Sequence, residues 1–226
     1  MAVELSSGVG FLATFFVLSG YTIYDNNLQD LSRCWPILIP TSPMFTPSEP
    51  SQVLRQRLKY QGRKFNFEVN SLRLPNGVQG DWECIRHPGG ALAVPITTDG
   101  RLVLVKQYRF AASGRLLEFP AGTVEPNETP MTTVQRELEE ETGYRAKEWQ
   151  ELGQFFLAPG YSDEMIYAFL AQGLEKLITP PLQDEDEDIE TVLLTPIELE
   201  RAILNGESVD AKSISSFFLA RPFLIG

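Results

Sequence analysis

Residues 129–143 form one capped helix pattern that carries a concentration of acid at the unfavourable end. Thr129 is a good N-cap, Pro130 suits the first helical position, and Gly143 stands where a glycine stop is common. The spacing therefore predicts a helix over about 130–142. Four of its last six residues are glutamates. Because a helix C-terminus carries partial negative charge, this arrangement calls for a compensating cation.

The helical period gives this segment an apolar stripe and an acidic edge. At roughly 100° per residue, Val134 and Leu138 lie within about 40° of each other and form the side that faces a core. Glu141 falls between these two residues in angle. Glu137 lies to one side of Glu141, and Glu140 lies further round the same side. Three carboxylates along one edge, one of them aligned with the core stripe, resist desolvation unless they are protonated or paired.

A hard divalent cation would relieve both the repulsion and the desolvation of these acids. Mg²⁺ prefers oxygen ligands such as carboxylates, waters and substrate phosphates. Arg136, four residues before Glu140, is placed to brace that carboxylate as an i,i+4 partner, whereas Glu139 points outward. The alternative is a solvated acidic face, which is what most charge runs are.

A longer pattern surrounds this helix. Gly122 is followed by five residues, then Glu128, then seven residues, and then the segment RELEEETG at 136–143. This pattern resembles the Nudix hydrolase box, G-x5-E-x7-R-E-U-x-E-E-x-G-U, in which U is aliphatic. Tyr144 departs from the last aliphatic position, which affects packing below the helix end and not the acids.

The resemblance implies a fold and a metal site. The fold is an α/β (α+β) one, a Nudix-type α/β/α sandwich with a mixed sheet. In that family, the glutamates corresponding to Glu137 and Glu141 bind divalent metal ions, and Glu140 supports or joins them. The backbone carbonyl of Ala121 is a further ligand. We therefore expect Mg²⁺, with Mn²⁺ as the alternative, and a catalytic contribution from Glu140 and Arg136.

Three further segments resemble the ADP-ribose pyrophosphatase subfamily. LAPGYSDE at 157–164 places Pro159 sixteen positions after the box glycine, and VKQYRF and LLEFPAG precede the box. The resemblance implies that Gln107, Arg109 and Glu118 bind substrate, and a guanidinium fork suits a diphosphate. The alternative for Arg109 is a surface ion pair, which is usually weak.

The acidic run QDEDEDIE at 183–190 is the expected source of the general base. In this subfamily, the glutamate that activates water comes from a loop at this place, and matching selects Glu187, with Glu185 in reserve. A carboxylate on such a loop can close over substrate and accept a proton from water. Acidic runs are otherwise ordinary solvated linkers.

The expected reaction is hydrolysis of a diphosphate bond. For ADP-ribose, in-line attack of water on one phosphorus gives AMP and ribose 5-phosphate. Two alternatives remain open. One is another nucleoside diphosphate sugar, such as GDP-mannose, because residues outside the box select the substrate. The other is a sensor that binds ADP-ribose without cleaving it.

Strand patterns on both sides of the helix complete the expected fold. Residues 59–74 and 77–87 flank the tripeptide Pro-Asn-Gly, and Asn-Gly between alternating apolar residues is a strong hairpin signal. We expect a small antiparallel β unit over 52–88 and a Nudix hydrolase domain over 89–226. Its other strands are expected at 91–97, 101–110, 116–122, 154–159, 165–172 and 190–196, and its other helices at 196–205 and about 211–221.

Residues 1–51 read as an apolar extension followed by a Pro/Ser-rich linker. The segment 8–24 is apolar over 17 residues, the lower limit for a membrane span, and no basic n-region of a signal peptide precedes it. We expect residues 1–43 to be dispensable and Met44 to begin the functional chain. On this interpretation we expect no membrane attachment.

Charge and cysteine usage bound the partners and the compartment. A formal net charge of -11 argues against binding long nucleic acids, which depends on neutralising phosphates with Lys and Arg. Two cysteines, Cys34 and Cys84, make at most one disulfide and fit a reducing, cytoplasmic compartment. One histidine, His87, excludes a His-rich zinc site, and its HPGG context favours a turn. The subfamily resemblance implies a homodimer.

Overall fold

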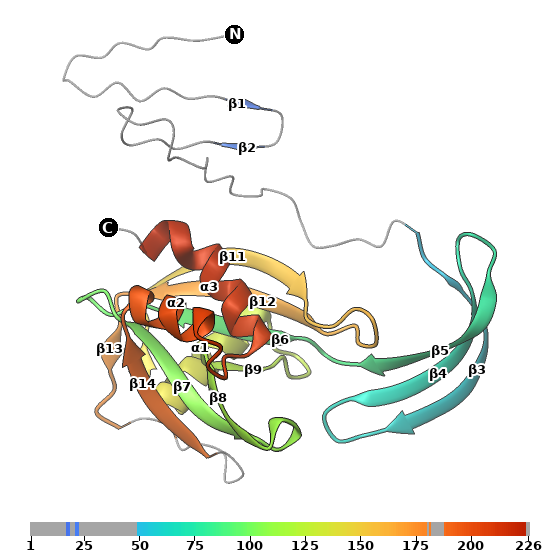
Figure 1. Cartoon of the computed structure of the whole chain (residues 1–226), viewed down its shortest axis with the longest axis horizontal. Coiled ribbons are helices and arrows are strands. Elements are labelled where there is room, and N and C mark those ends of the chain that lie inside the picture. Colours follow the sequence, from blue (N-terminus) through green and yellow to red (C-terminus); the bar gives the residue numbers. More distant parts are fainter. Residues whose placement is uncertain (1–16, 19–20, 23–48, 180, 182–187, 225–226) are drawn as a thin grey trace. The chain divides into compact units, whose positions relative to one another are not determined.

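The computed structural model describes residues 17–18, 21–22, 49–179, 181 and 188–224 (Figure 1). The chain divides into two compact units, residues 1–46 and residues 47–226. In the first unit, β1 (Val17–Leu18) and β2 (Tyr21–Thr22) form an antiparallel pair. Every element below belongs to the second unit. Within the described ranges, no helix has both the length and the apolar character that a membrane crossing requires.

A three-stranded antiparallel sheet forms the N-terminal β unit, in the order β3 (Gln52–Gln61), β4 (Asn66–Arg73) and β5 (Gln79–Arg86). The predicted hairpin is confirmed: Gly77 has φ of 85°, a value that favours glycine, and its amide donates to the carbonyl of Leu74 at 2.9 Å. Within 59–74, only the later part forms the arm of this hairpin, as β4. A second reversal divides that stretch, where the Gly62 amide donates to the Phe65 carbonyl at 3.1 Å.

The central sheet is mixed, as the family resemblance implied. Its order is β11 (Glu148–Phe156), β12 (Met165–Gln172), β6 (Gly90–Pro95) and β9 (Ala121–Thr123). Strands β12 and β6 run parallel, and the other neighbours run antiparallel. A second, antiparallel sheet has the order β14 (Ile189–Leu194), β7 (Leu102–Arg109) and β8 (Gly114–Glu118).

Helices cover both faces of the mixed sheet (Figure 1). Strand β6 is therefore buried on both sides. Ala91 and Ala93 belong to the core beneath α1 (Pro130–Thr142), whereas Leu92 and Val94 belong to the core beneath α2 (Pro196–Leu204) and α3 (Ala211–Leu224). The core beneath α1 consists of Ala91, Ala93, Val134, Leu138, Phe169 and Ala171. This three-layer arrangement confirms the expected sandwich.

Local details differ from the predictions where the chain changes sheet. The expected strand over 116–122 divides into β8 and β9 at Phe119 and Pro120, since proline has no amide hydrogen for a ladder. A short 3-10 turn, η1 (Phe110–Ala112), joins β7 to β8. The pair β10 (Tyr144–Arg145) and β13 (Glu175–Lys176) was not predicted. Helix α3 continues past Pro222 to Leu224.

Candidate active site

Helix α1 begins and ends as its capping residues predict. The Thr129 hydroxyl accepts from the amide of Thr132 at 3.1 Å, and Gly143 adopts a left-handed φ of 70°. The Gly143 amide donates to the carbonyl of Glu139 at 3.0 Å. Val134 and Leu138 are fully buried, which confirms the predicted stripe.

The acidic residues of α1 are unequally buried. Glu141 is 2% exposed and Glu137 is 9% exposed, although both are carboxylates. Glu139, predicted to point outward, has a side chain only 21% exposed. Arg145 covers it, because the chain turns back into β10 directly after the helix. The Arg145 guanidinium donates to both Glu139 carboxylate oxygens, at 2.6 and 2.8 Å.

Arg136 is the cation that holds the acidic edge together. Its Nη1 donates to Glu140 at 2.8 Å, which confirms the predicted i,i+4 brace, and lies 2.9 Å from Glu137. Its Nε and Nη2 donate to Glu128 at 3.1 and 3.2 Å. The hydrogen bond from Arg136, followed by one from the Thr133 hydroxyl, lowers the pKa of Glu128. Glu128 therefore anchors Arg136 from the loop before the helix.

Strand β9 holds the two most buried acids through its backbone. The Ala121 amide donates to the Glu141 carboxylate at 3.0 Å. A methyl group added at Gly122 would lie 1.8 Å from Oε1 and 2.5 Å from Cγ of Glu137, so the Glu137 side chain lies directly against this glycine. Gly122 is thus required for space and not for an unusual φ. The strand fixes Glu137 and Glu141, one helical turn apart, beside the same stretch of chain.

The donor set at this edge suits a hard divalent cation. The carboxylate oxygens of Glu137, Glu140 and Glu141 lie along this edge, and Mg²⁺ and similar ions prefer such oxygens. Across the described residues, no three ligating side chains by themselves enclose a metal. Arg136 instead contacts both Glu137 and Glu140. An ion held here would therefore take several ligands from water, backbone and substrate, as Mg²⁺ commonly does.

Arg109 lies on β7 beside this edge and is fixed by Glu118. Its Nε and Nη2 donate to the two carboxylate oxygens of Glu118 at 2.7 and 2.8 Å. The hydrogen bond to Glu118 is the main cause of the raised pKa of Arg109, and the charge of Glu141 adds to it. The ion pair considered as an alternative is therefore present, but its carboxylate is buried. The Arg109 side chain remains 40% exposed, so it can also meet a ligand.

The other predicted residues have different outcomes. Gln107 is buried on β7, where it faces Ile189 of β14. Glu185 and Glu187 lie outside the described residues. Asp188, which follows them, forms an ion pair with Arg115.

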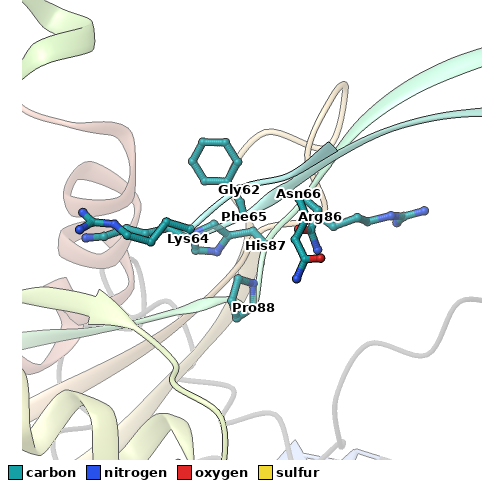
Figure 2. A pocket seen from close by; sticks show the side chains of 9 residues that line it. Gly62, Lys64, Phe65, Asn66, Arg86, His87 and Pro88 are labelled. Atoms are coloured by element: carbon teal, nitrogen blue, oxygen red, sulfur yellow. The ribbon is translucent and has the colours of Figure 1, made fainter. Parts of the chain in front are cut away.

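A basic pocket was missed by the sequence reasoning. Its volume is about 370 Å³, and Figure 2 shows the side chains around it. Arg86 of β5 links β4 to the loop at 158–164. Its guanidinium donates to Glu68 of β4 at 3.1 Å and to Asp163 of the loop at 3.0 Å. The lining residues come from two separate segments: Gln61, Gly62, Arg63, Lys64, Phe65, Asn66, Arg86, His87 and Pro88. The signal was weak because these basic residues converge only after folding.

This pocket adjoins the start of the box. Its last lining residue, Pro88, is followed by Gly89, whose carbonyl accepts from the Val124 amide at 3.0 Å. The next residue, Gly90, pairs with Thr123 of β9. The basic pocket and the acidic edge are therefore connected through two adjacent strands.

Comparisons with known proteins agree with this geometry. A model of the NUDIX domain matches residues 86–217. The chain belongs to the Nudix family. Nudix hydrolases generally use divalent metal ions. This membership accounts for the joint occurrence of the glycine, the Arg136 hub and the buried glutamates.

Three proteins illustrate the similarity. A methanol dehydrogenase activator of Bacillus methanolicus is 37% identical over 155 residues, covering 69% of this chain and 84% of that protein. An ADP-ribose pyrophosphatase of Bacillus subtilis is 36% identical over 154 residues, covering 68% and 83%. The crystal structure of an ADP compounds hydrolase superposes with a TM-score of 0.67 at 25% identity, covering 77% of this chain and 94% of that one.

Gly122→Ala tests whether β9 positions Glu137. The added methyl group must displace the Glu137 side chain, so we expect turnover to fall by about tenfold to hundredfold, the usual effect of misplacing a functional group by about 1 Å. The free energy of unfolding should fall by about 1–3 kcal/mol, the usual cost of forcing an extra methyl group against a buried side chain. Initial rates and urea unfolding measure the two effects.

The matched control is Gly114→Ala, because a methyl group there meets nothing nearer than a backbone oxygen at 3.7 Å. Equal turnover in the two variants, with both folded, would contradict the positioning of Glu137 by Gly122.

Proposed function

We propose that this Nudix protein hydrolyses the diphosphate bond of ADP-ribose and releases AMP and ribose 5-phosphate. The observation that carries the proposal is the buried acidic edge of α1, held by the backbone of β9, beside the half-exposed guanidinium of Arg109. An anionic metal site next to a guanidinium fork is the combination that a diphosphate requires. The similarity to an ADP-ribose pyrophosphatase supports this choice of substrate.

We assign the metal to Glu137, Glu141 and the carbonyl of Ala121, with Mg²⁺ as the preferred ion and Mn²⁺ as the alternative. Such an ion lowers the pKa of water and neutralises charge on the attacking and leaving oxygens. Arg136 holds the acidic edge in place, because it contacts Glu137, Glu140 and Glu128. Without the Arg136 guanidinium, the adjacent carboxylates would repel one another.

We assign binding of the diphosphate to Arg109, with Gln107 and Glu118 supporting it. Glu118 uses two guanidinium nitrogens of Arg109 and so fixes the plane of the fork. The basic pocket beside the box suits a further polar part of the nucleotide sugar, since Lys64, Arg86 and His87 line it. We assign the proton-accepting role to Glu187, with Glu185 in reserve, on the sequence resemblance alone.

We also propose a homodimer formed through the N-terminal β unit. Strand β3 is exposed along its whole length, and it displays apolar side chains: Val53 is 60%, Leu58 is 50% and Tyr60 is 67% exposed. A second copy would bury this surface. Light scattering at twice the chain mass would support the dimer, and a single-chain mass would exclude it. Cysteine usage supports a cytoplasmic location.

A substrate panel tests the proposed function directly. We expect Mg²⁺-dependent cleavage of ADP-ribose to exceed that of GDP-mannose, ADP-glucose, NADH and diadenosine polyphosphates. Released phosphate after phosphatase coupling measures the rates. Faster cleavage of GDP-mannose would contradict ADP-ribose as the substrate but would still support hydrolysis of a diphosphate bond. Binding of ADP-ribose without any cleavage would identify a sensor and contradict hydrolysis.

Glu141→Gln tests the metal assignment. The change removes one anionic ligand with little change in shape, so we expect turnover to fall by about two orders of magnitude or more, the scale of losing metal-assisted stabilisation. Calorimetric titration with Mn²⁺ should show weaker binding. Glu139→Gln is the control on the same helix, because Glu139 pairs with Arg145 away from β9. Near-normal turnover of Glu141→Gln would refute the assignment.

Glu187→Gln tests the general base. We expect turnover to fall at least about a hundredfold, the lower end of a single acid–base contribution, while Mn²⁺ affinity stays within about threefold. Glu185→Gln is the matched control in the same acidic run. A loss of metal affinity as large as the loss of turnover would move Glu187 into the metal site, and a larger effect in Glu185→Gln would exchange the two roles.

A further inference from the structure

A cluster of four charged residues lies where α3 begins, and it includes a lysine that the proposed reaction does not use. The Lys212 side chain is only 12% exposed. Its Nζ contacts Asp210 at 2.5 Å and also contacts the carboxylate of Glu118. Glu118 in turn accepts both hydrogen bonds from Arg109. Lys212 and Arg109 therefore share one buried carboxylate.

The first turn of α3 is attached to the segment that carries Glu118. Asp210 accepts from the Ser213 amide at 3.1 Å and so caps the helix. The Ser213 hydroxyl accepts from the Phe119 amide at 2.7 Å. Two residues further along, the Ala121 amide holds Glu141. One short segment, 118–121, thus connects the start of α3 to both Arg109 and Glu141.

The four charges balance within the cluster, with Arg109 and Lys212 against Glu118 and Asp210. Burial raises the pKa of Glu118, but the hydrogen bond from Arg109 and the charge of Lys212 outweigh burial, so the net pKa lies below its usual range. Burial lowers the pKa of Lys212, but Asp210 and Glu118 outweigh that effect and raise it. Glu118 and Lys212 therefore favour their charged forms.

We propose that Lys212 is a positioning residue for the diphosphate-binding arginine, acting through Glu118. By sharing the charge of Glu118 and balancing Asp210, it allows Arg109 to stay fixed in the fork geometry while the cluster presents no net negative charge to an anionic substrate. Without Lys212, two carboxylates would face one guanidinium, and the field at the site would oppose the diphosphate. The inference rests on the proposed function, because the binding role of Arg109 belongs to it.

The test compares variants that change the cluster charge in opposite directions. Lys212→Met leaves the cluster at one net negative charge, so we expect KM for ADP-ribose to rise roughly tenfold, the effect of one uncompensated charge near a partly buried anion site. We expect kcat to change by less than about threefold, because the metal ligands and the base are untouched. Asp210→Asn keeps a good cap and leaves one net positive charge, so KM should stay equal or fall.

The double variant supplies the readout that a merely structural role would not move. Lys212→Met combined with Asp210→Asn restores neutrality and should return KM to within about threefold of wild type. A structural role predicts instead that both single changes raise KM and that the double change is worse than either. If Lys212→Met does not fold, the direction of the KM change in Asp210→Asn still decides between the two.

Lys147→Met is the matched control, since Lys147 also pairs with an acid, Glu175 at 2.5 Å, but is 63% exposed. It changes the net charge of the chain equally and should leave KM unchanged. If the wild-type protein cleaves ADP-ribose and Lys212→Met has the same KM as Lys147→Met, this inference alone is overturned. Wild type that cleaves no member of the substrate panel would overturn the proposed function, and this inference with it.

Discussion

The burial of carboxylates on α1 is the constraint on which the rest of the site depends. Glu137 and Glu141 are turned toward the protein interior, where uncompensated negative charge is costly. The structure meets that cost with the Ala121 amide at one acid and with Arg136 at the edge. These contacts hold the two carboxylates in a fixed orientation beside β9.

The segment from Glu118 to Gly122 connects the two halves of the site. It leaves one sheet at β8 and enters the other at β9. At its first residue it fixes the guanidinium of Arg109, and at its last it lies against Glu137. The proposed diphosphate-binding arginine and the proposed metal ligands are therefore positioned by adjacent parts of one short stretch of chain. Rigid placement of this kind is what allows binding groups and reacting groups to act together.

Helix α1 was the most predictable part of the fold, because capping and periodicity are local properties. Its limits, its buried stripe and the Arg136–Glu140 contact all agree with the sequence prediction. The sequence pattern did not locate the turn that divides 59–74, nor did it reveal that Arg145 covers the outward-pointing Glu139. The basic pocket was not predicted because its two lining segments are remote in sequence.

The sequence by itself determined the spacing of the Nudix motif, a layered arrangement of strands and helices, and the residues that form the acidic edge. These depend on spacing along one helix and on alternation within strands, which short-range sterics and hydrophobic periodicity dictate. The α/β/α sandwich with a mixed sheet was implied by the resemblance to the Nudix family. Only the tertiary structure decided that Arg109 and Lys212 share Glu118, and that Gly122 is small to make room for Glu137. Such contacts join residues up to 94 positions apart, and their geometry is set by how the layers pack.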